Sequence, residues 1–256
     1  MNENINPNRF ADSAGRPWEG RSFDQNAFAD DDGKAPAELI EVIKKFRAGQ
    51  VGAEDVVDQI RVSRLLVPLL ANLGESEEGA HGHKVDKSAE LSIVTVKSPD
   101  DQDSLVVFSS VESMTLWNKE SRPVPTDAIR VSLAAASQMS TRVVLDPGSE
   151  SEFVIRRPAI AKIAQSLPWM PPEKNPEVLK VLKESIAGEE LVVEVDAATA
   201  DPGSRLAGAE LLVSLQLQPG SAPDQVKELI ERVSSFWSRS EEFASSVDSV
   251  SIKLRT

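Results

Sequence analysis

The sequence predicts an α+β protein of two domains with mostly antiparallel sheets, preceded by a flexible acidic arm. Short apolar runs with the alternation of strands are interspersed with segments whose apolar residues recur at the spacing of amphipathic helices. A proline-rich run at 168–175 interrupts this pattern and is expected to be a linker. Residues 1–33 contain too few apolar side chains to offset the entropy of ordering, so they form the arm. The domains are therefore expected at 34–167 and 176–256.

The composition disfavours several classes of function. The chain of 256 residues has a formal net charge of -13, and like charges oppose binding to nucleic acid or to an anionic membrane. It has no cysteine, which excludes disulfides, thiolate metal sites and cysteine nucleophiles. No run is apolar enough to cross a bilayer, and the N-terminus lacks the pattern of a signal peptide. We therefore expect a cytoplasmic protein.

Three aromatic residues of the arm lie in polar surroundings. Trp18 and Phe23 belong to the run PWEGRSF, and Phe28 begins the run FADDDG. Aromatic residues in short polar segments are typical of docking motifs. Trp18, Phe23 and Phe28 are therefore candidates for docking to a partner protein, and the alternative that they fold back onto the protein's own surface has equal weight.

Two helices and a strand are predicted at the start of the first domain. Leu39, Val42, Ile43 and Phe46 have helical spacing within 38–47, and a second helix is expected at 53–60. The run RLLVPLLA at 64–71 is apolar on both faces, as in a strand that is covered on both sides. Pro68 lacks an amide donor, which indicates an edge strand or a bulge.

The middle of the chain predicts a strand pair that leads into a helix. Strands at 91–96 and 105–108 are expected to pair antiparallel across a polar connection. Ser109 and Glu112 have the capping-box spacing, so a helix should follow the second strand directly. Further elements are expected in the order helix, strand, strand and helix, at 129–136, 142–146, 153–156 and 158–167.

The second domain is predicted to begin with a helix that Asn175 caps and Pro176 starts. Two strands, an amphipathic helix and a last strand follow, at 191–195, 210–217, 226–237 and 250–254. A helix followed by the order β-β-α-β is typical of a small α+β domain.

Charged residues at strand ends are the candidates for a ligand site. Lys87 and Glu90 lie just before a predicted strand, and Arg156 and Arg157 lie at the end of another. A solvated charged face accounts for the same residues, since 27% of the chain is charged. His81 and His83 resemble a metal motif but lack the further histidine that such a site requires. The sequence therefore predicts no catalytic residue, no metal site and no cofactor.

Several motifs resemble, in order and spacing, the N-terminal domain of the SseB family, the enhanced serine sensitivity proteins. They are RLLVPLLA, DKSAELSIVTV, SLVVFSSVESMTLW, RPVPTDAIR, VVLDPG and RRPAIAKIAQSLPWMPP, and they cover 64–172. The arm resembles that of actinobacterial members, and the chain after Asn175 resembles the family's C-terminal domain through weaker motifs. The family has no settled catalytic residues, so the resemblance implies a fold and not a reaction.

These observations lead to two alternative functions. We expect a cytoplasmic, non-catalytic interaction or regulatory protein of the SseB type with a protein partner. The alternative is a small-molecule-binding sensor or enzyme linked to amino-acid metabolism, with a pocket near Lys87 and Arg156. The strand at 250–254 lies at the chain end and can also join the sheet of a second copy, so a homodimer is a further expectation.

Overall fold

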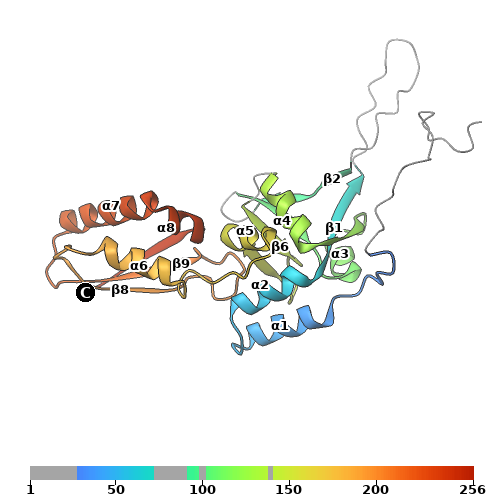
Figure 1. Ribbon diagram of the computed structural model, residues 1–256, viewed down its shortest axis with the longest axis horizontal. Helices are drawn as coiled ribbons and strands as arrows, with labels where there is room; N and C mark the ends of the chain where they lie inside the picture. Colours follow the sequence, from blue (N-terminus) through green and yellow to red (C-terminus); the bar gives the residue numbers. More distant parts are fainter. Residues whose placement is uncertain (1–27, 72–90, 98–101, 138–140) are drawn as a thin grey trace, which may run out of the picture. The chain divides into compact units, whose positions relative to one another are not determined.

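The structure is a computed structural model that describes residues 28–71, 91–97, 102–137 and 141–256. The predicted α+β class is confirmed, because helices alternate with mostly antiparallel strands (Figure 1). None of the helices in these ranges is long and apolar enough to span a membrane.

Residues 32–256 form one compact unit with a separate hydrophobic core at each end of its sequence. We call residues 32–175 the N-terminal half and residues 176–256 the C-terminal half. The domain boundaries expected from the sequence stay a prediction.

A four-stranded mixed sheet is the centre of the N-terminal half. Its order is β3-β4-β6-β7, in which β4 and β6 run parallel and the outer pairs run antiparallel. The strands span Thr95–Lys97 (β3), Asp103–Val107 (β4), Arg142–Leu145 (β6) and Phe153–Arg156 (β7). Leu105 and Val106 point to opposite faces of the sheet and are both buried, so β4 is covered on both faces.

Four of the predicted helices of the N-terminal half pack against one face of this sheet. They are α1 (Ala37–Arg47), α2 (Ala53–Val62), α4 (Ala128–Ser137) and α5 (Arg157–Ala164). Their apolar side chains, such as Leu39 and Ile60, share one core with Phe153 of β7. The helical spacing in the sequence therefore marks the buried stripe of each helix.

The second sheet of the N-terminal half has the order β2-β1-β5. Its strands are β2 (Leu91–Ile93), β1 (Arg64–Ala71) and β5 (Arg122–Asp127). The expectation that Pro68 places β1 at an edge is wrong, since β1 is the central strand. Pro68 lies opposite Pro123 on one side. On its other side it lies between two pairings, the bridge from Leu66 to Phe108 and the ladder that starts at Leu69, so its missing amide interrupts neither.

Strand β5 was not predicted because of its two prolines. Pro123 and Pro125 lie opposite Pro68 and Leu66 of β1. The amide of Leu66 donates to Phe108 at 2.8 Å, away from β5, so these are non-hydrogen-bonded pairs of the β1–β5 ladder. An amide at position 123 or 125 would point away from β1, toward the outer edge of the sheet. Proline costs no ladder hydrogen bond there, and it protects the edge from pairing with another chain.

The strand predicted at 91–96 is two strands. β2 pairs with β1, whereas β3 begins at Thr95 and pairs antiparallel with β4. The expected pairing is therefore confirmed for β3 and wrong for β2. Val94 lies between the two strands, and its carbonyl accepts the amide of Val106 at 3.3 Å. The chain moves from one sheet to the other at Val94.

Helix α3 (Val111–Trp117) follows β4 as predicted, but its N-cap is different. Ser110 is the N-cap, and its Oγ accepts the amide of Ser113 at 3.0 Å. Ser109, the residue expected to cap the helix, is buried and donates its hydroxyl to Asp146 instead. The predicted capping box of Ser109 and Glu112 is therefore absent, because Ser109 binds Asp146 and Ser110 caps the helix.

The buried carboxylate of Asp146 joins the ends of β4 and β6. Its Oδ2 accepts the hydroxyls of Ser109 at 2.6 Å and Ser151 at 2.7 Å, and its Oδ1 accepts the Ser109 amide at 2.8 Å. Burial raises the pKa of Asp146, against the opposing effect of these hydrogen bonds. The residue has a φ of 48°, a region that aspartate adopts more readily than most residues. The DPG turn is therefore tied to the loop before α3.

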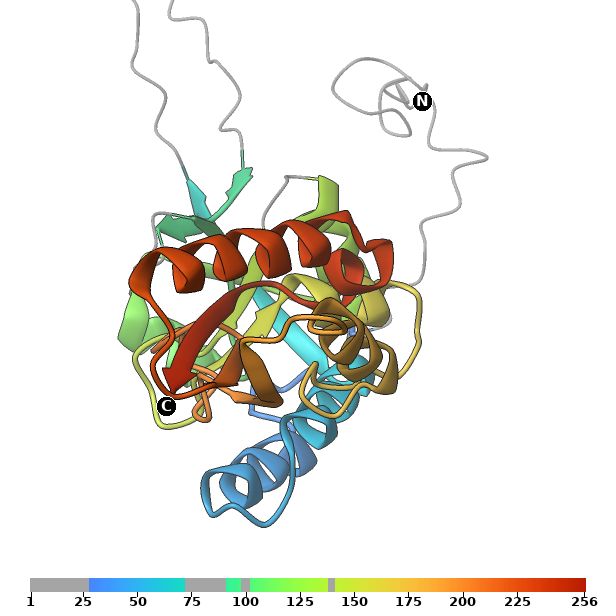
Figure 2. The same cartoon turned by 90° about the vertical axis from the view of Figure 1, so that its left-hand side faces the viewer.

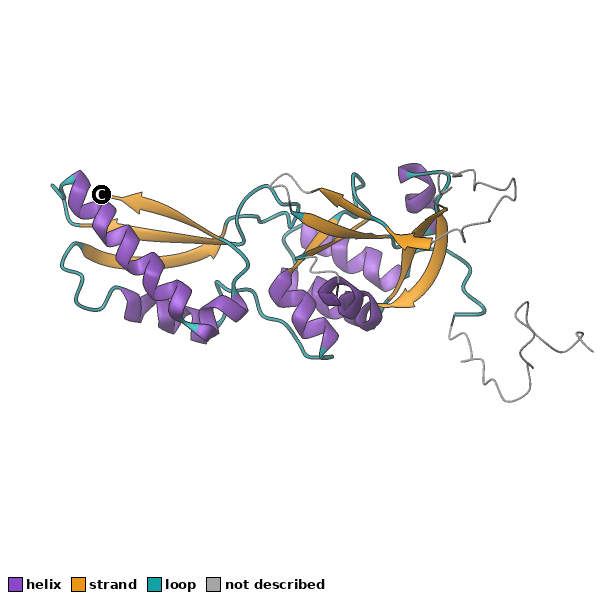
Figure 3. Ribbon diagram, turned by 90° about the horizontal axis from the view of Figure 1, so that it is seen from above, coloured by secondary structure: helices purple, strands orange, loops and turns teal. Residues whose placement is uncertain are grey.

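The C-terminal half is a three-stranded sheet whose helices lie on one face (Figure 3). The strands are β8 (Val192–Thr199), β9 (Leu211–Leu217) and β10 (Val250–Arg255). The central strand β9 pairs antiparallel with β8 and parallel with β10. The predicted helix followed by β-β-α-β is confirmed, and the chain ends at the tip of β10 (Figure 2).

Three helices cover this sheet. They are α6 (Pro176–Ser185), α7 (Pro223–Arg239) and α8 (Glu241–Ser246). Asn175 caps α6 as predicted, since its Oδ1 accepts the amide of Glu177 at 3.0 Å. Helix α8 was not predicted; Ser240 ends α7 and caps α8 by accepting the amide of Phe243 at 3.2 Å. Phe243 then stacks on Trp237 within the core.

We expect Asp146→Ala to lower the free energy of unfolding by about 2–3 kcal/mol, because it leaves the buried amide and hydroxyl of Ser109 without their acceptor. Urea denaturation measures this loss. Asp103→Ala is the control, since Asp103 makes an exposed ion pair with Lys97 and should contribute less than about 1 kcal/mol. Equal losses in the two variants would contradict the structural role of Asp146.

Candidate functional site

The topology of the C-terminal half gathers three carboxylates at one end of its sheet. Strand β8 ends at this edge, and β9 and β10 begin there, because β9 is antiparallel to β8 and parallel to β10. Asp201 follows β8, Glu210 precedes β9 and Asp248 precedes β10. All three side chains are at most about one-twentieth exposed. Buried carboxylates need partners, and the N-terminal half supplies cations for Asp201 and Asp248.

Arg156 is the main partner of these carboxylates. It is the last residue of β7 and is 6% exposed. Its Nη2 donates to Asp201 Oδ2 at 2.7 Å and to the carbonyl of Gly208 at 2.8 Å. Its Nη1 donates to Asp248 Oδ2 at 3.2 Å and to the Ser249 hydroxyl at 3.3 Å. The guanidinium therefore connects the ends of three strands of the C-terminal half to the first sheet.

Two further arginines strengthen this connection. Arg142, the pairing partner of Arg156 on β6, donates from Nη2 to Asp248 Oδ2 at 3.2 Å. Arg157 donates from Nη2 to the carbonyls of Ala244 at 2.8 Å and Val247 at 2.7 Å, at the C-terminal end of α8. A cation at this position satisfies carbonyls that the helix leaves free.

The loop from Asp201 to Glu210 is shaped by the Asp201 carboxylate. This carboxylate accepts the amides of Arg205 at 3.1 Å and Leu206 at 2.8 Å as well as the Arg156 guanidinium. A Cβ at Gly208 would lie 2.8 Å from the carbonyl oxygen of Ala200, so the tight return of the loop requires glycine. The loop also pairs with β7, where the amide of Val154 donates to the carbonyl of Ser204 at 2.8 Å.

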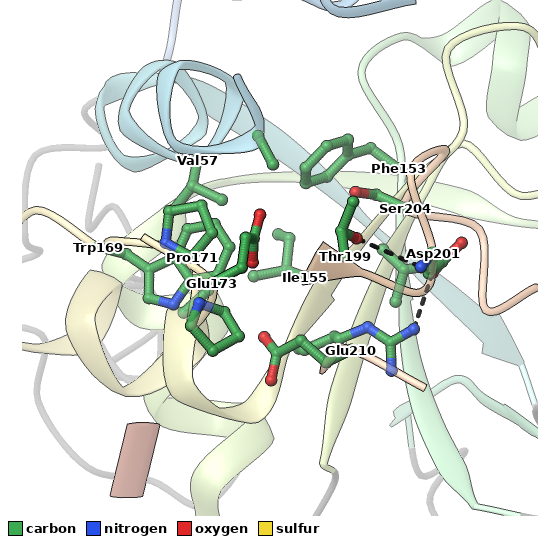
Figure 4. Close-up of a pocket in the computed structure, with 15 residues that line it drawn as sticks. Val57, Phe153, Ile155, Trp169, Pro171, Glu173, Thr199, Asp201, Ser204 and Glu210 are labelled. Atoms are coloured by element: carbon green, nitrogen blue, oxygen red, sulfur yellow. Dashed lines mark hydrogen bonds and ion pairs between the residues drawn. The ribbon is translucent and has the colours of Figure 1, made fainter. Parts of the chain in front are cut away.

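A small pocket lies beside these ion pairs (Figure 4). Its volume is about 40 Å³, which is room for one or a few water molecules rather than for a drug-sized ligand. Trp169, Pro171, Pro172, Glu173 and α2 form part of its wall, and Arg156, Asp201 and Glu210 are among the other residues that line it. Residues of the Pro-Trp-x-Pro-Pro motif therefore meet residues of the C-terminal half.

Glu210 is the least satisfied charged group of the pocket. Its Oε2 accepts the amide of Asp248 at 2.5 Å, whereas its Oε1 is buried and has no hydrogen-bond partner among the described residues. Burial, together with the charges of Asp248 and Glu173, raises the pKa of Glu210 to about 7, and Arg156 opposes this effect. This carboxyl group therefore gains or loses its proton near neutral pH.

Two neighbours share the unsatisfied character of Glu210. The indole Nε1 of Trp169 is buried without a hydrogen-bond partner in the described ranges. Burial also raises the pKa of Glu173, and the nearby charge of Glu54 adds to this effect. An unpaired donor, an unpaired acceptor and two carboxyl groups thus line one small pocket.

Of the site residues that the sequence indicated, the structure describes Phe28, Arg156 and Arg157. Lys87, Glu90, Trp18 and Phe23 lie outside the described residues, as do His81 and His83. Phe28 is half-buried in a turn, where its carbonyl accepts the amide of Asp31 at 3.1 Å. Arg156 and Arg157 lie together at the junction described above. Within the described ranges, no group of three or more His, Asp or Glu is placed to hold a metal ion.

Sequence reasoning missed the other members of the junction. Glu210 is the first residue of a predicted strand, and Asp201 and Asp248 lie in the connections before and after predicted elements, where many acids of this chain lie. The available signal was Glu210, which directly precedes a run of apolar and alternating residues. Trp169 was assigned to a linker, although an aromatic residue among prolines often packs against a neighbouring surface.

Residues 39–162 match a family model described as the SseB protein N-terminal domain. This segment of the chain belongs to the SseB family. The match includes β7 and the start of α5, so Arg156 and Arg157 lie within the SseB domain. It ends before Trp169, and the expected SseB C-terminal domain after Asn175 stays a prediction. No curated protein sequence and no solved structure matches the chain.

Glu210→Gln should remove a pH dependence of stability. The folded-state pKa of about 7 lies above the ordinary value of 4.5, so the folded protein holds this proton more tightly than the unfolded chain. The resulting stability is present below about pH 4.5 and is lost as the pH rises through 7, a decrease of about 3 kcal/mol at most. We expect Glu210→Gln to flatten this decrease in urea titrations at pH 5, 6, 7 and 8.

Glu120→Gln is the matched control for this prediction, because Glu120 is exposed in a turn. It should keep the decrease in stability of the unmodified protein. If Glu210→Gln kept it as well, the buried carboxyl would not be its source.

Arg156→Met should lower the free energy of unfolding by about 3–5 kcal/mol, because it leaves the Asp201 carboxylate buried without a cation and leaves Asp248 with Arg142 alone. Chemical denaturation measures this change. Arg255→Met removes the exposed ion pair with Asp196 and should cost about 1 kcal/mol or less. A loss for Arg156→Met as small as that of the control would show that the junction contributes no net stability.

Proposed function

We propose that this SseB-family protein is a cytoplasmic, non-catalytic interaction or regulatory protein that binds a protein partner. The observation that carries the proposal is the uncovered face of the sheet in the C-terminal half (Figure 3). All helices of this half pack on the opposite face, where alternate residues of β9 enter the core. The uncovered face is therefore a regular surface that the described residues of this half leave open to another protein.

The chemistry of this face fits a protein partner. Each strand contributes polar side chains to it, among them Asp196 of β8, Ser214 of β9 and Lys253 of β10, which lie side by side in register. Glu194 and Gln216 form the next row, and Arg255 makes an ion pair with Asp196 across the face. Charges of both signs suit electrostatic complementarity with a protein surface better than with a polyanion.

Both edges of the same sheet support the proposal. β8 and β10 are the outer strands, and each pairs on one side only among the described residues. An outer strand can extend a partner's sheet, and a second copy of this chain is one candidate partner. The aromatic residues of the arm, Trp18, Phe23 and Phe28, are proposed as a second docking segment on the basis of the sequence.

We expect Ser214→Arg to reduce capture of the partner protein at least tenfold, because a long cation at the centre of the face blocks close contact. Affinity capture from cell extract, quantified by mass spectrometry, measures the loss. Ser238→Arg, on the exposed helical side, is the matched control and should leave capture unchanged. Both variants lie on the surface and should alter stability by less than about 0.5 kcal/mol.

If Ser214→Arg and Ser238→Arg captured the same proteins in the same amounts, a role of this face in partner binding would be contradicted. A chain that starts at Pro36 tests the arm in the same assay, since it lacks Trp18, Phe23 and Phe28. Light scattering at two protein concentrations shows whether the captured partner is a second copy of the chain.

The junction pocket favours a second candidate function, a small-molecule-binding sensor or enzyme linked to amino-acid metabolism. The supporting observation is that Glu210 Oε1 and Trp169 Nε1 are buried next to the pocket without hydrogen-bond partners among the described residues. Polar atoms in this condition are uncommon in folded proteins, and ligand sites are one place where they occur.

A further inference from the structure

The charges that line the junction pocket are unbalanced. Glu173, Asp201 and Glu210 contribute carboxyl groups, and Arg156 is the one guanidinium among the lining residues. The hydrogen bonds of Arg156 go to Asp201, Asp248, Ser249 and the Gly208 carbonyl. Glu173 and Glu210 make no ion pair within the described part of the chain. The pocket therefore holds an excess of negative charge when these two groups are ionised.

Glu210 also presents a buried acceptor to this pocket. The residue is 6% exposed, its side chain extends into the pocket in Figure 4, and its Oε1 accepts no hydrogen bond from the described residues. An unpaired buried carboxylate oxygen is costly, so a donor that reaches it is stabilised strongly. The complement of this atom is an N–H or O–H group, and a positively charged donor is the best complement.

The size and the walls of the pocket restrict the ligand further. A volume of about 40 Å³ excludes a nucleotide, a sugar or a long peptide side chain folded inside. Ala53 and Val57 of α2 and the rings of Pro171 and Pro172 line it, so part of the wall is apolar. A ligand with one charged donor group and a short carbon chain matches both the acceptor and this wall.

We propose that the junction pocket binds the protonated amino group of a small primary amine, with Glu210 and Glu173 as the acceptors and Pro171 and Pro172 against the carbon chain. This inference rests on the second candidate function, ligand binding, and is independent of partner binding at the sheet. Three N–H donors allow an ammonium group to reach two carboxylates together.

The ionisation of the pocket supports this choice of ligand. Burial, Asp248 and Glu173 raise the pKa of Glu210 to about 7, and Arg156 opposes them. A bound cation would lower the pKa of both carboxyl groups, and by linkage its affinity should increase from pH 6 to pH 8.5 as Glu210 ionises. A small primary amine stays protonated throughout this range, since amines of this type titrate near pH 10.

Methylammonium chloride is the probe, and the indole N–H resonance of Trp169 is the reporter. The chain has four tryptophans, so the indole region of a ¹H–¹⁵N spectrum has few signals, and Trp169→Phe assigns the one needed. The upper limit on affinity per heavy atom puts the Kd of so small a cation at roughly 5–10 mM or weaker. We expect a saturable shift of the Trp169 signal at pH 8.5 and a Kd at least fivefold weaker at pH 6.

Variants and salts separate a site from a general ionic effect. Glu210→Gln keeps the size of the side chain, and Glu173→Gln gives a second test if the first variant folds poorly; each should weaken binding at least fivefold. Glu120→Gln should leave the Kd unchanged. Potassium chloride and tetramethylammonium chloride at equal concentration should give no saturable shift, because neither offers an N–H donor.

The outcomes distinguish this inference from the proposals on which it stands. No saturable shift with methylammonium, or an equal response to potassium, would overturn the amine site. A saturable shift with neutral methanol or with acetate, and none with methylammonium, would overturn the amine site and leave ligand binding at the pocket standing. Neither result bears on the capture assay with Ser214→Arg.

Discussion

The guanidinium of Arg156 lies almost out of contact with water between two carboxylates from separate segments of the C-terminal half. Removing a cation and two anions from water costs several kcal/mol for each ion, and the cost is offset only when the hydrogen bonds are well made. Arg156 meets this condition with four acceptors from Asp201, Gly208, Asp248 and Ser249. If one of these contacts is broken, the desolvation cost of the buried ions is no longer offset. The junction therefore favours one arrangement of the strand ends.

The second consequence of this junction is the state of Glu210. Its neighbours already use the available cations: Arg142 and Arg156 bind Asp248, and Arg156 also binds Asp201. A further carboxylate beside them is left with the amide of Asp248 as its donor, which is why burial raises its pKa to about 7. A buried carboxylate without a cation partner accepts a proton or a cation. The state of the junction then depends on the pH or on the concentration of that cation. The amine site that we propose would use this electrostatic imbalance.

Much of the fold follows from local patterns, and the exceptions have physical reasons. Helices α1 and α6 and strand β9 follow the apolar spacing closely, because packing acts on the same residues that the spacing marks. Strand β5 was missed because proline normally excludes a strand, and only its register opposite Pro68 makes Pro123 and Pro125 acceptable. The N-cap moved from Ser109 to Ser110 because Asp146, distant in the sequence, competes for Ser109. The site was half predicted: Arg156 and Arg157 were named, but their partners depend on which strand ends the topology brings together.

The double-mutant cycle of Arg156→Met and Asp201→Asn tests the central claim that this ion pair holds the strand ends of the C-terminal half against the first sheet. The cycle separates the energy of the Arg156–Asp201 pair from that of the other hydrogen bonds of each residue. Effects of one substitution on the loop are the same with and without the other substitution, so they cancel. Urea denaturation of the four proteins should give a coupling energy of at least about 1.5 kcal/mol. A coupling energy within about 0.3 kcal/mol of zero would show that Arg156 and Asp201 act independently and would contradict the account.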